Sequence, residues 1–164
     1  MRKIIPFVVT GAALSFFITG CAGTSGSFTV DTEDNVIKIV ADNSDETEAT
    51  GNLTVEENDY VIFSPDFTNG SVNVRFIPDT GYNESSFPDP EKSEIVYEGA
   101  FSGRVLSTEV IAPGDYYVFI SSDKADGTML ITTENKDEFE KQNKDLEKEL
   151  ENLNIELEKE TKEQ

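Results

Sequence analysis

The sequence predicts a mainly β protein, in which an antiparallel β-sandwich or jelly-roll-like domain is followed by a C-terminal amphipathic α-helix. Three observations lead to this fold class. Between Phe28 and Thr133, apolar residues recur in short runs, and several runs alternate with a period of two. Turn signals rich in Gly, Asn, Asp and Pro separate most of these runs. After Thr133 the apolar period changes to alternating steps of three and four residues, which is typical of a helix.

The clearest expected strand covers residues 71–76 (SVNVRF), in which Val72, Val74 and Phe76 share one face. We expect further strands at residues 36–40, 53–55, 60–63, 95–101, 104–111, 115–120 and 128–132. We expect turns at residues 56–59, 68–70, 102–103, 113–115 and 126–127. Roughly eight or nine short strands at this spacing are typical of an antiparallel sandwich.

Two segments of the β region lack a strand pattern. Residues 42–52 (DNSDETEATGN) are acidic and contain almost no large apolar side chains. Residues 78–94 contain three prolines and show little periodicity. We expect both segments to be exposed loops.

The N-terminal segment resembles a targeting sequence. Arg2 and Lys3 precede an apolar stretch at residues 4–18, which Pro6 and Gly11 interrupt. A transmembrane helix needs about 20 mostly apolar residues. The short, interrupted stretch therefore fits the apolar core of a signal peptide, and we expect residues 1–20 to be removed from the mature chain.

Cys21 is the only cysteine, and it directly follows Ile18, Thr19 and Gly20. These four residues resemble the lipobox of bacterial lipoproteins, although Ile18 stands where leucine is commoner. The resemblance covers the first 21 residues and implies cleavage before Cys21 and attachment of a lipid, with fatty acids such as palmitate, to its thiol. Two acyl chains anchor a protein stably to a membrane. The implied location is the extracytoplasmic face of the cell membrane; the alternative is an ordinary signal peptide.

The composition excludes several function classes. The chain has 33 acidic and 13 basic residues, and its net charge is −20. Such a surface repels phosphate backbones and anionic lipids, so we expect no nucleic-acid partner and membrane attachment only through the lipid. The chain has no His and a single Cys, which excludes Ser-His-Asp and Cys-His catalysis and the usual imidazole or thiolate metal sites.

We expect no cofactor, with calcium as the alternative, since carboxylate oxygens remain available as ligands. The candidates are four aspartates in acidic clusters: Asp42, Asp45, Asp123 and Asp126. Their spacing does not match an EF-hand. The other explanation of these clusters is a solvated charged loop.

Tyr82 and Phe87 are candidate ligand-binding residues because they lie in a polar segment where burial does not explain them. Exposed aromatic rings stack on sugars in many sandwich domains. Trp is common among such rings, and this chain contains none. The alternative is a loop folded back on its own aromatic side chains.

Residues 112–120 (APGDYYVFI) and 127–131 (GTMLI) resemble the closing hairpin of bacterial pre-peptidase C-terminal domains. Those domains are small β-sandwiches of secreted proteins. The segment also resembles small lipoproteins of anaerobic Gram-positive bacteria that carry one such sandwich. The resemblance covers about twenty residues and implies a fold, not a particular activity.

The C-terminal segment has the pattern of one long helix. Asn135 and Glu138 resemble a capping box that would start it. An apolar stripe at heptad spacing follows, formed by Phe139, Leu146, Leu150, Leu153 and Leu157, with Asn143 in the same series. The flanking e and g positions carry no basic residue; they are Glu140, Gln142, Glu147, Glu149, Asn154 and Glu156.

A parallel homodimer of this helix would therefore gain almost no attractive pairs between g and e positions. Four arrangements stay open: a coiled coil, a helical partner for residues 136–160, packing on its own domain, and a single solvated helix.

Together these patterns predict four parts: a signal peptide at 1–20, a lipidated cysteine and tether at 21–27, a β-sandwich at 28–133 and a charged helix at 134–164. We expect a lipid-anchored surface lipoprotein with a non-enzymatic binding or scaffolding role at the cell envelope, toward a protein or glycan partner. One alternative is a carbohydrate-binding or substrate-capture module. Another is an envelope hydrolase that uses carboxylates.

Overall fold

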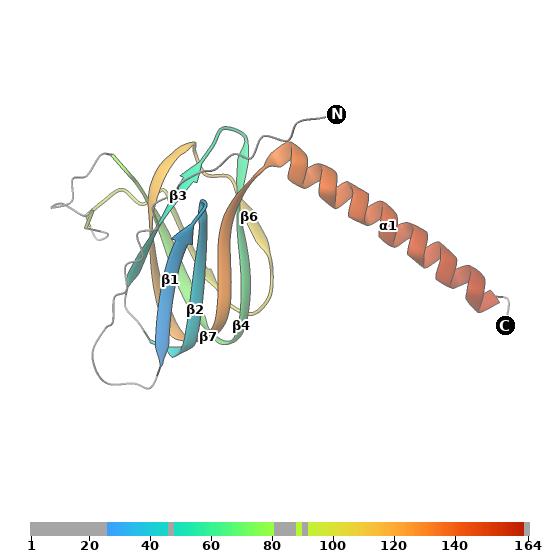
Figure 1. The fold of residues 1–164 in the computed structure, drawn as a ribbon, viewed down its shortest axis with the longest axis horizontal. Helices are drawn as coiled ribbons and strands as arrows, with labels where there is room; N and C mark the ends of the chain where they lie inside the picture. The colour runs from blue at the N-terminus through green and yellow to red at the C-terminus, as the bar shows by residue number, and fades with distance from the viewer. Residues whose placement is uncertain (1–25, 46–47, 81–87, 90–91, 163–164) are drawn as a thin grey trace, which may run out of the picture.

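The computed structural model describes residues 26–45, 48–80, 88–89 and 92–162. The described part is a single seven-stranded antiparallel sheet followed by one long helix, so the expected fold class is confirmed (Figure 1). The elements are β1 (Ser27–Glu33), β2 (Val36–Ser44), β3 (Ala49–Val55), β4 (Asp59–Pro78), β5 (Tyr97–Phe101), β6 (Ser107–Glu109), β7 (Gly114–Asn135) and α1 (Lys136–Lys162).

Two long strands, β4 and β7, organise the sheet. They pair along their whole length, from Asp59 opposite Asn135 to Pro78 opposite Tyr116. β3 pairs with the first half of β7, and β2 pairs with its second half and also with β1. β6 pairs with the first half of β4 and β5 with its second half. Because both long strands bend, the one sheet folds over on itself and encloses the core as a sandwich.

The bend lies where the sequence predicted two turns, and that prediction was wrong. Residues 68–70 and 126–127 do not reverse the chain, because β4 and β7 continue through them with shifts in register. Gly70 and Lys124 take positive φ angles of 68° and 49°, and Gly127 has a φ of 141°. Left-handed residues and bulges bend a strand without ending it. The strands are therefore fewer and longer than expected.

The prediction that residues 42–52 form an exposed loop was also wrong in part. β2 continues to Ser44 and β3 already begins at Ala49. Ser44 is buried, and its Oγ lies 3.0 Å from the Oγ of the buried Ser122. A hydroxyl pair satisfies both polar groups inside the sandwich, which allows a polar sequence to form a strand there.

The alternating apolar side chains in the second half of β4 face the core, as the sequence predicted. Val72, Val74 and Phe76 are fully buried, as expected. Phe63 lies in an aromatic cluster with its ring centroid 4.5 Å from that of Phe101 and 5.3 Å from that of Tyr97, and both pairs are stacked. Aromatic contacts of this kind add roughly 0.5–1.5 kcal/mol beyond the burial of their area. The cluster joins β4 to the edge strand β5.

Asn35, in the turn between β1 and β2, bonds to the neighbouring strands β3 and β7. It follows Asp34 in a two-residue turn between β1 and β2, with φ angles of 50° and 61°, which suits a type I′ hairpin. Its Oδ1 accepts a hydrogen bond from the Thr54 amide at 2.7 Å, and its Nδ2 donates to the Thr54 carbonyl at 2.8 Å. Its Nδ2 also donates to Thr133 Oγ1 at 3.0 Å. One side chain therefore ties this hairpin to β3 and β7.

Tyr116 fixes the start of β7. Its hydroxyl donates a hydrogen bond to the Ala112 carbonyl at 2.6 Å, across the turn that contains Gly114. Burial raises the pKa of Tyr116, so the hydroxyl stays protonated and remains a donor. A tyrosine bonded to backbone a few residues upstream is a recurrent lock in β-sandwiches.

Candidate functional site

The helix α1 continues β7 without an intervening loop. Asn135 is the last residue of β7, and its Oδ1 accepts a hydrogen bond from the Asp137 amide at 3.1 Å. The Lys136 amide donates to the Asn58 carbonyl at 2.9 Å. Asn135 is thus the N-cap, as the sequence predicted. Asp137 and Glu138 in the first turn stabilise the positive end of the helix dipole.

The first turns of α1 pack against the β domain through Tyr60 of β4. The Phe139 ring meets the Tyr60 ring edge to face, with centroids 5.7 Å apart. Lys136 Nζ lies 5.3 Å from the centroid of the same ring, and the Tyr60 hydroxyl donates to Glu140 Oε1 at 3.4 Å. These contacts, together with the cap, hold the base of the helix in one direction.

Beyond this base, α1 extends away from the β domain (Figure 1). A helix of 27 residues is about 40 Å long. The described part of the chain leaves Leu146, Leu150 and Leu153 at 58%, 60% and 55% exposure. The apolar stripe of the sequence therefore exists on the folded protein as an open surface. We call Leu146, Leu150 and Leu153 the leucine stripe.

Acidic side chains lie beside the leucine stripe, and basic side chains lie on the opposite face of α1. At 100° per residue, Glu140, Glu147 and Glu149 flank it, and all three are exposed. Lysines lie on the opposite face; they are Lys141, Lys144 and Lys148. Glu140 pairs with Lys144 at 3.9 Å and Asp145 with Lys148 at 3.4 Å. Pairs at these spacings stabilise an isolated helix by about 0.2–0.5 kcal/mol each.

A second exposed apolar area, beside β6, was missed by the sequence reasoning. Val105, Leu106 and Val110 are 75%, 53% and 66% exposed. Residues 104–111 were predicted to be one strand, but only Ser107–Glu109 pair with β4. Strand length depends on the partner, so the alternation within this segment could not show that its ends leave the sheet.

The fold brings the four calcium candidates to the bent end of the sandwich. Ser44, the last residue of β2, pairs with Ala125 there; Asp42 and Asp45 lie on either side of Ser44, and Asp123 and Asp126 on either side of Ala125. All four aspartates are exposed. Within the described residues, no three acidic, His or Cys side chains group closely enough to hold a metal ion.

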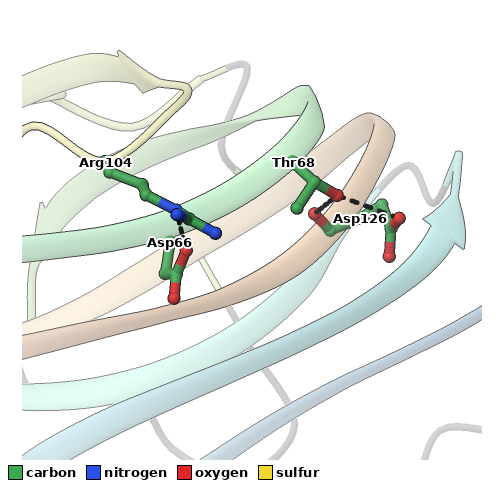
Figure 2. Close-up of polar contacts among 4 residues, drawn as sticks. All are labelled: Asp66, Thr68, Arg104 and Asp126. Atoms are coloured by element: carbon green, nitrogen blue, oxygen red, sulfur yellow. Dashed lines mark hydrogen bonds and ion pairs between the residues drawn. The ribbon is translucent and has the colours of Figure 1, made fainter.

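Asp126 instead takes part in a polar contact across the bend (Figure 2). Thr68 Oγ1 donates to the Asp126 carboxylate at 3.0 Å and lies 3.2 Å from its carbonyl oxygen. Nearby, Arg104 Nε lies 2.5 Å from Asp66 Oδ1 in an exposed ion pair. Both contacts link segments that meet at the bend, which is a structural role.

The remaining candidate residues fall outside the described residues. They are Ile18, Thr19, Gly20 and Cys21 of the lipobox and the two loop aromatics, Tyr82 and Phe87. Their roles stay predictions. Within the described residues, no helix is both long and apolar enough to cross a membrane.

No protein-family model matches the sequence, and a search of curated proteins gave no significant match. The resemblances of the lipobox and of the closing hairpin therefore rest on their own residues. The described residues carry two groups of large apolar side chains that are more than half exposed: the leucine stripe, and Val105, Leu106 and Val110 beside β6.

Proposed function

We propose that the protein is a lipid-anchored envelope protein with a non-enzymatic scaffolding role, in which the β domain presents α1 to a protein partner. The observation that carries this proposal is the exposed leucine stripe on a helix whose base is fixed to the domain. A helix that serves only as a charged tail does not require leucines at heptad spacing.

The energetics support binding through this surface. Burial of one leucine side chain contributes roughly 1.5–3 kcal/mol, and Leu146, Leu150 and Leu153 are each more than half exposed. A partner that covers them gains much of that free energy. The contacts of Tyr60 with Phe139 and Lys136 already order the base of the helix. Ordering before binding lowers the entropic cost of association.

The start of β1 and the start of α1 lie at opposite ends of the β domain, which suits an anchored scaffold. β1 begins at Ser27, which pairs with Asp42 beside the bent end, whereas α1 begins at the other end of β7. From Gly127 to Asn135, β7 covers about 25 Å at roughly 3.3 Å per residue. With a lipid on Cys21, a short tether would lead to the bent end, and α1 would start at the end far from the membrane.

The anchor is tested at the sole cysteine. Replacing Cys21 with alanine is expected to abolish incorporation of a fatty-acid analogue and to leave the precursor uncleaved, because the acceptor thiol is gone. The measurement is metabolic labelling of the full chain in a bacterial host that processes lipoproteins, followed by gel mobility. A Thr24→Ala variant is the matched control and should label like the unchanged chain. Equal labelling of the Cys21→Ala chain would exclude Cys21 as the lipid site.

A further inference from the structure

We infer that the partner of α1 is an amphipathic helix of another protein, whose apolar stripe is flanked by Lys or Arg. This inference rests on the proposed function and specifies the partner's chemistry. It starts from the two edges of the leucine stripe, where Glu140, Glu147 and Glu149 are exposed.

These edges determine which surface can cover the leucines. With Leu146 and Leu153 at heptad position d and Leu150 at a, Glu140 and Glu147 occupy e and Glu149 occupies g. In a pair of helices, the e and g side chains of one helix lie beside those of the other. A partner therefore meets an apolar strip between two negative edges, and basic residues at its own edges would form ion pairs there.

A second copy of the chain does not provide such edges. A parallel copy would set Gln142 against Glu147 and Glu149 against Asn154, and an antiparallel copy would set e against e and g against g. The parallel arrangement gains no attractive pair, and the antiparallel one brings glutamates together. Lys144 pairs with Glu140 of its own helix at 3.9 Å, and Lys141 and Lys148 lie on the face away from the stripe, so none of these three lysines occupies an e or g position.

Two other surfaces are also disfavoured. The contacts at Tyr60 point α1 away from its own β domain, and the described residues leave the leucine stripe exposed. A membrane with anionic head groups repels the glutamate edges, as it repels a chain with 33 acidic residues against 13 basic ones. A basic amphipathic helix satisfies both the apolar strip and its acidic edges.

The test uses two synthetic 21-residue helical peptides with leucine at every a and d position. One peptide carries lysine at e and g, the other glutamate, and the remaining positions are identical. The protein is residues 21–164 with Cys21→Ser, which contains every described element. We call this protein the soluble chain. Titration by calorimetry at neutral pH and low salt is expected to show at least tenfold tighter binding of the lysine peptide.

Two sets of variants separate the contributions. Leu146→Ala, Leu150→Ala and Leu153→Ala together keep helix propensity and should weaken binding of the lysine peptide at least tenfold. As matched control, Lys141→Ala, Lys144→Ala and Lys148→Ala change the opposite face and should leave binding unchanged or slightly tighter. Circular dichroism checks that both triple variants keep α1.

The outcomes distinguish this inference from the proposed function. Binding of the lysine peptide that survives loss of the three leucines would overturn the inference, because charge alone would then explain it. Equal binding of the glutamate peptide, or a stable dimer of the soluble chain at neutral pH, would overturn the basic partner but leave a presented helix. Failure of both peptides to bind an accessible stripe would also overturn it. A stripe shielded by the chain's own domain would overturn the proposed function itself.

Discussion

Replacing Phe63 with alanine is expected to lower the free energy of unfolding by about 3–5 kcal/mol. Phe63 is fully buried at the centre of the sandwich. Its ring stacks on Phe101 and Tyr97 and meets the edge of Phe76 at a centroid distance of 6.2 Å. Truncation removes these contacts and leaves a cavity between β4 and β5. Small domains have only about 5–15 kcal/mol of total stability, so the loss would be severe.

Urea denaturation of the soluble chain measures this effect, with Leu130→Ala as the matched control. Leu130 also lies in a long strand, β7, but its side chain is 41% exposed. The control should lose about 1 kcal/mol or less, as is usual for surface positions. Equal losses in the two variants would show that the aromatic cluster is not the centre of the core.

The second large effect is expected at the bend, where Gly127→Ala should cost about 2–6 kcal/mol. Gly127 has a φ of 141°, a backbone conformation that residues with a side chain rarely adopt. A Cβ at this position would lie 2.1 Å from the Asp66 carbonyl oxygen and 2.8 Å from the Phe67 Cα. Both neighbours are backbone atoms of β4, so no side-chain rotation relieves the clash, and β4 and β7 would have to separate.

Gly103→Ala is the matched control for this variant. Gly103 also has a positive φ, 66°, but a Cβ there would meet nothing within 4 Å. Only the backbone strain of about 1–2 kcal/mol is then expected. Urea denaturation of both variants separates the two contributions. A Gly127→Ala chain as stable as the Gly103→Ala chain would mean that the strands do not pack this closely at the bend.

The bend also shows where sequence reasoning reached its limit. Thr68, Gly70 and Gly127 were assigned to turns because glycine beside small polar residues favours positive φ. The same preference serves a bulge inside a continuous strand. Which of the two forms depends on whether a neighbouring strand pairs across the segment, and that information lies far away in the sequence. Local conformation was predictable, but the direction of the chain was not.

Features that depend on neighbours in sequence were predicted more successfully. Val72, Val74 and Phe76 alternate along the chain and are all buried. Asn135 caps the helix through a bond to an amide two residues away. Ser44, in contrast, lies in a polar segment that predicted a loop, and its burial depends on the hydroxyl of Ser122, 78 residues away in the sequence. Polar residues inside a sandwich need such remote partners, which a single sequence does not reveal.

One part of the candidate site could likewise be predicted from neighbours in sequence, and another part depends on the fold. The leucine stripe was visible as a heptad pattern, but four arrangements of the helix stayed open. The contacts of Tyr60 with Phe139 and Lys136 disfavour one of them, packing of the stripe on its own domain, because they set the direction in which α1 leaves the sheet. These residues come from separate elements, β4 and α1, that only the fold brings together. Exposure of Leu150 is therefore a property of the tertiary structure.

The central claim is that the leucine stripe is held open for a partner, and thiol labelling tests it most directly. Leu150→Cys in the soluble chain should react with a water-soluble maleimide at the same rate as Glu151→Cys, which lies off the stripe on the same helix. Both side chains are exposed in the parent chain. Equal rates, close to those in urea, are the predicted result. A rate at least tenfold slower at position 150 than at 151 would show that the stripe is already covered and would contradict the claim.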